Sequence, residues 1–141
     1  MTIFSGFLAF IVLFVIGLAW FFIYYYANPV IDKPDGIARV TGNCGDTMEI
    51  GLKFQGDRVQ DTHHWTNGCS FSKQCVETAA RLARDKTVEE LQKIHMVTIM
   101  DEVGKLPETH LHCAQLAETT LQRSVKNYLG KQSTKRVNRE K

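Results

Sequence analysis

The opening stretch of this 141-residue chain constrains its fold more than any other feature. Residues 2–31 contain no charged side chain, and residues 3–27 are almost continuously apolar and aromatic. As a helix rising 1.5 Å per residue, residues 3–27 would reach about 37 Å, which crosses the roughly 30 Å hydrocarbon layer of a bilayer with some tilt. We therefore predict a single-pass transmembrane anchor over residues 1–28 that contacts membrane lipid through residues 3–27.

The ends of this stretch favour an anchor over a cleaved signal peptide. A signal peptide has a basic leader, an apolar core of about 7–15 residues and small residues at its cleavage site. Met1 and Thr2 offer no basic side chain, and the apolar core is too long. Trp20 and the three tyrosines at 24–26 suit an aromatic belt at the membrane interface, and Pro29 would stop the helix.

Charge and cysteine usage favour a cytoplasmic location for the rest of the chain. Basic residues concentrate on the cytoplasmic side of a span, and here none precedes the span while Lys33 and Arg39 follow it. Four cysteines without a dense regular pattern do not resemble a secreted disulfide scaffold. The 17 basic and 15 acidic residues balance, which by itself argues neither for nor against nucleic acid or an acidic partner, and we expect no nucleic-acid partner.

The part after the anchor predicts two strands. Residues 31–40 are interpreted as a linker or a first edge segment, with the linker itself set at residues 29–38. Residues 47–54 alternate, with Met48, Ile50, Leu52 and Phe54 on one face, which is typical of a half-buried strand. A turn at residues 55–57 leads to a return strand at 58–66.

Helical patterns fill the remainder. Residues 69–85 carry an apolar stripe, and a second helix opens at Thr87, where Thr87 and Glu90 form a capping-box pattern. Residues 97–103 are expected to be helical again. The last helix is predicted to start near Pro107 and to end at about Leu129 because Gly130 follows. Residues 132–141 would then be a basic tail, either solvated and disordered or attracted to anionic lipid or an acidic partner.

The chemistry of the chain centres on a glycine-rich stretch at residues 42–46, in which Cys44 and Asp46 are separated by one glycine. Cys69 and Cys113 are each predicted to lie at a helix start, where amide groups and the helix dipole lower the pKa of a thiol and favour the metal-binding thiolate. His112 and Asp46 could add a nitrogen or an oxygen ligand. Three thiolates plus one of these would suit zinc or an iron–sulfur cluster.

Other interpretations of these residues remain open. No C-x-x-C pair occurs, and a cysteine taken alone is more often a small buried hydrophobe. Cys75 is predicted to pack in the core, with an auxiliary thiol as the alternative. His110 is a second candidate for the role of ligand or proton partner. The remaining histidines are expected at the surface or in the core: His63, His64 and His95.

Taken together, three sequence segments resemble the IscU/NifU N-terminal iron–sulfur scaffold family. They are Cys44-Gly45-Asp46-Thr47-Met48, then Asn67-Gly68-Cys69, and finally Leu106-Pro107 followed by His112-Cys113 and Leu116-Ala117-Glu118. The resemblance extends over a scaffold domain at residues 39–131. It implies an α+β fold in which a small antiparallel sheet has helices packed on one side, with a cluster site at one end.

The resemblance also implies a function. Such a scaffold is not an enzyme; it builds a [2Fe-2S] cluster from iron and from sulfur delivered as persulfide by a cysteine desulfurase, and passes the cluster to apo-protein acceptors. Cys44, Cys69 and Cys113 would bind the cluster, and Asp46 would keep it labile. Cys113 would be the persulfide acceptor, and His112 a possible fourth ligand.

The chain departs from the family pattern in three places. Family scaffolds are normally soluble, so the anchor is unusual. Pro107 is followed by Glu108-Thr109-His110 where the family often has Pro-Val-Lys, which puts use of an Hsp70-type chaperone in doubt. The residues after Cys69 are Ser70-Phe71-Ser72-Lys73 instead of a run of small residues, so the partner surface there could differ.

Two other functions remain as alternatives. The first is a membrane-tethered protein-interaction module that binds zinc in the same site or binds no metal. The second is a thiol enzyme or oxidoreductase, which is disfavoured because the chain has no C-x-x-C motif and offers no facing base.

Overall fold

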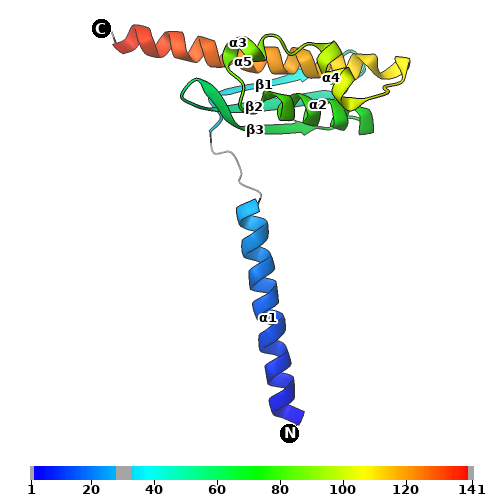
Figure 1. Ribbon diagram of the computed structural model, residues 1–141, viewed down its shortest axis with the longest axis vertical. Coiled ribbons are helices and arrows are strands. Elements are labelled where there is room, and N and C mark those ends of the chain that lie inside the picture. Colours follow the sequence, from blue (N-terminus) through cyan, green and yellow to red (C-terminus); the bar gives the residue numbers. More distant parts are fainter. Residues whose placement is uncertain (1, 28–32, 140–141) are drawn as a thin grey trace. The chain divides into compact units, whose positions relative to one another are not determined.

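The computed structural model describes residues 2–27 and 33–139, and the chain divides into two compact units, Met1–Val30 and Ile31–Lys141. The first unit contains one helix, α1 (Thr2–Ala27), shown in Figure 1. Its segment Leu8–Tyr25 is long and apolar enough to cross a membrane and is not buried against any other described part of the chain. The predicted helix is therefore present, and membrane crossing remains a prediction.

The second unit begins with a three-stranded antiparallel sheet in the order β1-β2-β3. The strands are β1 (Gly36–Thr41), β2 (Thr47–Gln55) and β3 (Arg58–Thr66). Alternation along β2 buries Met48, Ile50 and Leu52 completely. Residues 29–32 of the predicted linker lie outside the described residues, whereas residues 36–38 belong to the edge strand β1, in line with the alternative that this stretch is a first edge segment.

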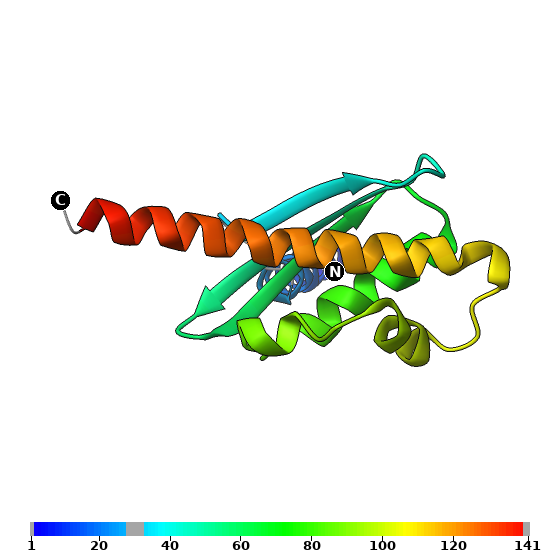
Figure 2. The same ribbon diagram turned by 90° about the horizontal axis from the view of Figure 1, so that it is seen from above.

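Helices cover one face of this sheet. They are α2 (Ser70–Ala83), α3 (Val88–Leu91), α4 (Met96–Val103), the 3₁₀ turn η1 (Glu108–His110) and α5 (Leu111–Arg139). Both α2 and α5 contact the sheet as well as each other, and Figure 2 shows α5 lying along the strands. The α+β fold with helices on one side of an antiparallel sheet is thereby confirmed.

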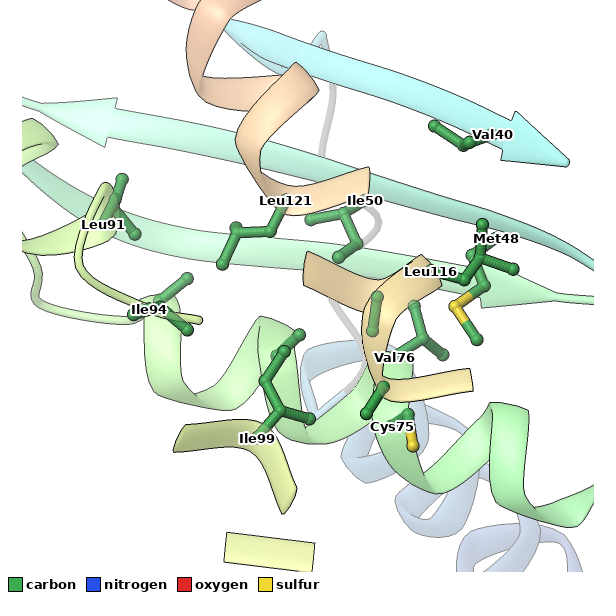
Figure 3. Packing of buried hydrophobic residues seen from close by; sticks show 14 of the residues in the cluster. Val40, Met48, Ile50, Cys75, Val76, Leu91, Ile94, Ile99, Leu116 and Leu121 are labelled. Atoms are coloured by element: carbon green, nitrogen blue, oxygen red, sulfur yellow. The ribbon is translucent and has the colours of Figure 1, made fainter. Parts of the chain in front are cut away.

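The core lies between the sheet and these helices. Figure 3 shows Met48 and Ile50 from β2 meeting Val76 of α2 and Leu121 of α5. Cys75 is fully buried in the same cluster, which confirms the prediction that it packs in the core. The capping box of Thr87 and Glu90 is also present and begins the short helix α3.

The predicted end of the last helix is wrong. Helix α5 continues through Gly130 to Arg139, so residues 132–139 are helical and do not form a disordered tail. A glycine inside a helix costs only about 1 kcal/mol, so Gly130 does not have to end α5. Two contacts between α5 and the sheet lie just before Gly130. The Tyr128 ring stacks on Phe54 at 3.8 Å between centroids, and Asn127 donates a hydrogen bond of 2.7 Å to the Ile37 carbonyl.

The path of α5 defines two ends of the domain. A Cβ atom added to Gly36 at the start of β1 would lie 2.8 Å from Tyr128 Cβ, whereas one added to Gly42 after β1 would lie 3.1 Å from Leu116 Cδ2. The β1–β2 loop, the end of β3 and the starts of α2 and α5 therefore share one end, which we call the thiol end (residues 42–46, 66–73 and 110–116). The β2–β3 turn and the later part of α5 lie at the opposite end.

Candidate metal centre at the thiol end

Three candidate ligands converge at the thiol end. One carboxylate oxygen of Asp46 and the sulfur atoms of Cys69 and Cys113 all lie within 4.8 Å of one another. They come from three separate places: the β1–β2 loop, the N-cap of α2 and the first turn of α5. The sheet thus brings together residues that are far apart in the sequence.

The loop that carries Asp46 is a closed turn. The Gly42 amide donates a hydrogen bond of 2.9 Å to the Asp46 carbonyl, and the Gly45 amide donates one of 3.0 Å to the Gly42 carbonyl. Gly45 has φ 87°, a left-handed conformation that glycine adopts without steric cost. Asn67 Oδ1 accepts a hydrogen bond of 2.7 Å from the Thr47 amide, which ties the loop to the segment before α2.

Ser72 lies at the centre of the three ligands, and the sequence did not single it out. Its side chain is fully buried, and its hydroxyl donates a hydrogen bond to Asp46 Oδ2. The Ser72 hydroxyl oxygen lies 3.3 Å from Cys113 Sγ and 3.6 Å from Cys69 Sγ. The available signal was its position three residues after Cys69, which puts both side chains on one face of α2.

Gly68 permits this close packing. A Cβ atom at that position would lie 2.5 Å from Asp46 Oδ2 and 2.6 Å from Ser72 Cβ, so no side chain fits there. The Asn67-Gly68-Cys69 segment therefore holds Asp46 against the start of α2.

The two thiols of the group differ in pKa. The Ser72 backbone amide donates a hydrogen bond to Cys69 Sγ and lowers the pKa of the Cys69 thiol, as predicted for a residue at a helix start. Burial raises the pKa of the Cys113 thiol, whose side chain is fully buried. The prediction that both cysteines are primed as thiolates is therefore wrong for Cys113, because desolvation outweighs the helix N-terminus.

Cys44 lies outside this group of three. It is exposed and lines a neighbouring groove of about 500 Å³ together with His112, Leu116 and Arg123. His112 is also exposed, and its ring lies 6.1 Å from that of His110, which packs on Phe71. The structure thus places two predicted ligands, Cys44 and His112, in one groove beside the group formed by Asp46, Cys69 and Cys113.

The other candidates lie elsewhere. Burial raises the pKa of the Cys75 thiol to about 12, so this sulfur stays protonated in the core. His63 Nε2 lies 3.6 Å from Glu49, and His95 Nδ1 lies 3.1 Å from Glu118. Both are exposed, as is His64, so these three histidines lie at the surface.

The fold and the site together define a class: a small α+β domain that gathers thiols and a carboxylate at one end of an antiparallel sheet. The family model of the NifU-like N-terminal domain matches residues 26–135. This chain belongs to that family, which confirms the resemblance drawn from its motifs.

Known relatives agree. The chain is 35% identical over 113 residues to the iron–sulfur cluster assembly scaffold protein IscU 1 of Archaeoglobus fulgidus, covering 76% of this chain and 73% of that protein. It is 32% identical over 86 residues to the iron–sulfur cluster assembly protein IscU of Plasmodium falciparum, covering 61% and 52%.

Among solved structures, a NifU-like N-terminal protein from Brucella abortus is similar with a TM-score of 0.57. It is 21% identical in sequence, and the match covers 72% of this chain and 83% of that one. At this identity the likeness concerns the fold alone.

Proposed function

We propose that this protein is a membrane-anchored scaffold on which an iron–sulfur cluster is assembled and from which it is transferred. The observation that carries the proposal is the convergence of Asp46, Cys69 and Cys113 within 4.8 Å. Thiolate sulfur and carboxylate oxygen are donors that iron accepts, and the relatives are named as iron–sulfur cluster assembly proteins. The cluster, of the [2Fe-2S] type, is cargo and not a resident cofactor.

We assign Cys69 and Cys113 to the fixed part of the ligand set and Cys44 to its mobile part. Cys44 precedes Gly45. A Cβ atom added to Gly45 would meet no other atom within 4 Å, so this part of the loop has room to move. Asp46 would weaken retention, because a carboxylate holds a cluster less firmly than a fourth thiolate. His112, which lines the same groove as Cys44, would be a possible fourth ligand.

Sulfur delivery follows from the same arrangement. The Cys113 thiolate would attack the terminal sulfur of a cysteine desulfurase persulfide, forming a new S–S bond and releasing the desulfurase thiolate. Because Cys113 is fully buried beside Ser72, this step requires the 42–46 loop to open. An apo-protein acceptor would then take the cluster from the exposed Cys44 side.

Helix α1 gives the proposal its membrane component. The exposed apolar segment Leu8–Tyr25 would cross the bilayer once, with the domain on the cytoplasmic side where Lys33 and Arg39 follow the span. We propose that the anchor keeps cluster delivery close to membrane-bound acceptors. Deletion of residues 1–27 should then reduce cluster delivery in cells, and unchanged delivery would contradict this role.

The function is tested by anaerobic reconstitution of the purified full-length chain with ferrous iron and sulfide. Visible absorption should show sulfide-to-iron charge-transfer bands, and Mössbauer spectra should identify the cluster type. A Cys44→Ser/Cys113→Ser variant should lose the bands, whereas Cys75→Ala, a matched cysteine change in the core, should keep them. Absence of bands in the unaltered chain, or bands unchanged in the double variant, would refute the proposal.

A zinc-binding interaction module is the second candidate, because two thiols and a carboxylate also suit tetrahedral zinc. Metal analysis of protein purified anaerobically without added metal separates the two. Stoichiometric zinc that iron and sulfide cannot replace would favour this candidate over a cluster scaffold.

A further inference from the structure

A second charged feature lies at the end of the domain opposite the thiol end. An open pocket of about 600 Å³ is lined there by five basic side chains and one carboxylate. The basic residues are Lys33, Lys53, Lys131, Lys135 and Arg136, and the carboxylate is Asp35. We call this feature the basic pocket.

Most of this positive charge is uncompensated. Lys53 Nζ lies 3.9 Å from Asp35 Oδ2, which in turn accepts a hydrogen bond from the Phe54 amide. Within residues 33–138, no ion pair joins any of the other four basic side chains to a carboxylate. The pocket therefore attracts anions.

Three of the basic residues, Lys131, Lys135 and Arg136, belong to the last part of α5. Figure 2 shows the helix continuing past the sheet towards its C-terminus. Up to Tyr128, the face of α5 that packs on the sheet carries no charge: Leu121 and Val125 are buried there, and buried Ser124 donates a hydrogen bond to the Ile50 carbonyl. One turn later the same side of the helix carries Lys131, Gln132 and Lys135 beside Phe54 and Tyr128. The change from uncharged to basic residues occurs without a break in the helix, so these basic residues belong to the same continuous helix α5.

Chain connectivity sets an upper limit on the distance between Lys33 and the C-terminal residue of α1. Lys33 follows Ala27, the last residue of α1, by six positions. At about 3.5 Å per extended residue, Lys33 stays within roughly 21 Å of that end. Anionic lipid attracts basic residues near a bilayer surface, and this electrostatic attraction falls off within about one Debye length of the surface.

We propose that the basic pocket docks on the anionic phospholipid headgroups of the membrane in which α1 is anchored. This inference rests on the anchoring part of the proposed function and not on the cluster. Four uncompensated cations around an open, wide pocket fit several headgroup phosphates better than one small anion. Docking by this end leaves the thiol end free for a sulfur donor and a cluster acceptor.

The test uses the full-length chain in nanodiscs of phosphatidylcholine with or without phosphatidylglycerol. Lysine acetylation is followed by mass spectrometry. Lys131 and Lys135 should be acetylated about fivefold more slowly in the anionic discs, as expected for the binding contribution of one basic residue, and 0.5 M salt should remove the protection. Lys73 at the thiol end and Lys105 between α4 and η1 should react at the same rate in both discs.

A charge-matched pair of variants sharpens the result. Lys131→Gln/Lys135→Gln/Arg136→Gln should abolish the lipid-dependent protection of Lys53, because three contributions of about fivefold are lost. Lys73→Gln/Lys93→Gln/Lys105→Gln removes the same charge elsewhere and should leave that protection intact. Two controls distinguish failure of this proposal from failure of the proposed function. Retention of each protein in neutral discs at high salt shows whether α1 is inserted, and cluster reconstitution shows whether the thiol site binds a cluster.

Four outcomes would overturn the docking proposal. Equal acetylation rates of Lys131 in neutral and anionic discs would show no lipid contact, and equal loss of protection in both triple variants would show only a net-charge effect. Protection by 10 mM inorganic phosphate in neutral discs would identify a site for a small anion. Protection by polyglutamate in neutral discs, without any effect of phosphatidylglycerol, would point to an acidic protein.

Discussion

The thiol end has a fixed half and an open half. In the fixed half, buried Ser72 and Cys113 hold Asp46 and Cys69 through hydrogen bonds and close contacts between three elements. In the open half, Cys44 is exposed on a glycine-containing loop beside a groove. We therefore propose that assembly depends on the fixed half, whereas the open half controls retention and release of the cargo.

The largest effect is expected from the fixed half. Cys113→Ser should lower cluster occupancy more than about a hundredfold, since even outer partners of a metal site contribute 10–100-fold. Cys44→Ser should still assemble a cluster but release it about tenfold faster. Absorption during reconstitution measures cluster occupancy, and transfer to a chelator measures the release rate. Equal loss of occupancy in the two variants would contradict different roles for the two halves.

Thiol reactivity should also separate the cysteines. Because the pKa of Cys69 is lowered and that of Cys113 is raised, alkylation by iodoacetamide at pH 7–8 should be at least about tenfold faster at Cys69. Below each pKa, the rate should rise about tenfold per pH unit as thiolate forms. Peptide mass spectrometry follows each site, and a Cys113 rate equal to that of Cys69 would contradict the burial of Cys113 within the fixed half.

Asp46 links the two halves. Asp46→Ala should slow cluster release by about threefold to tenfold while assembly persists, because the carboxylate that we propose keeps the cluster labile is removed. Transfer kinetics to an apo-ferredoxin provide the measurement. Complete loss of cluster binding would show that Asp46 is required for assembly and does not merely loosen the site.

The smallest effect is expected at Ser72. Ser72→Ala should lower the free energy of unfolding by about 1 kcal/mol, because half-buried Asp46 and buried Cys113 lose a hydrogen-bond partner. Urea unfolding of the metal-free chain measures the change. Ser70→Ala changes an exposed serine in the same helical turn and is the matched control. Equal effects of the two changes would contradict a stabilising role for the Ser72 hydrogen bonds.

Local patterns were sufficient for much of the fold. The alternation of Met48, Ile50 and Leu52 identified β2, and Thr87 with Glu90 identified the start of α3, because both signals arise from neighbours in the sequence. The same local logic failed at Gly130, which α5 passes two residues after Tyr128 stacks on Phe54. A glycine stop signal is weak because a glycine costs a helix only about 1 kcal/mol.

The site was predictable in composition but not in arrangement. The motifs pointed to Asp46, Cys69 and Cys113, and the structure brings these three together. The central place of Ser72, the burial of Cys113 and the separate position of Cys44 depend on how α2 and α5 pack against the sheet.

The sequence by itself determined the apolar helix, the strands and the family, because these depend on residue pattern and motif spacing. Only the tertiary structure decided which thiol is buried, which is exposed and where the positive charge gathers. The physical reason is that desolvation and through-space charge depend on segments far apart in the chain, and no local pattern records which of them meet.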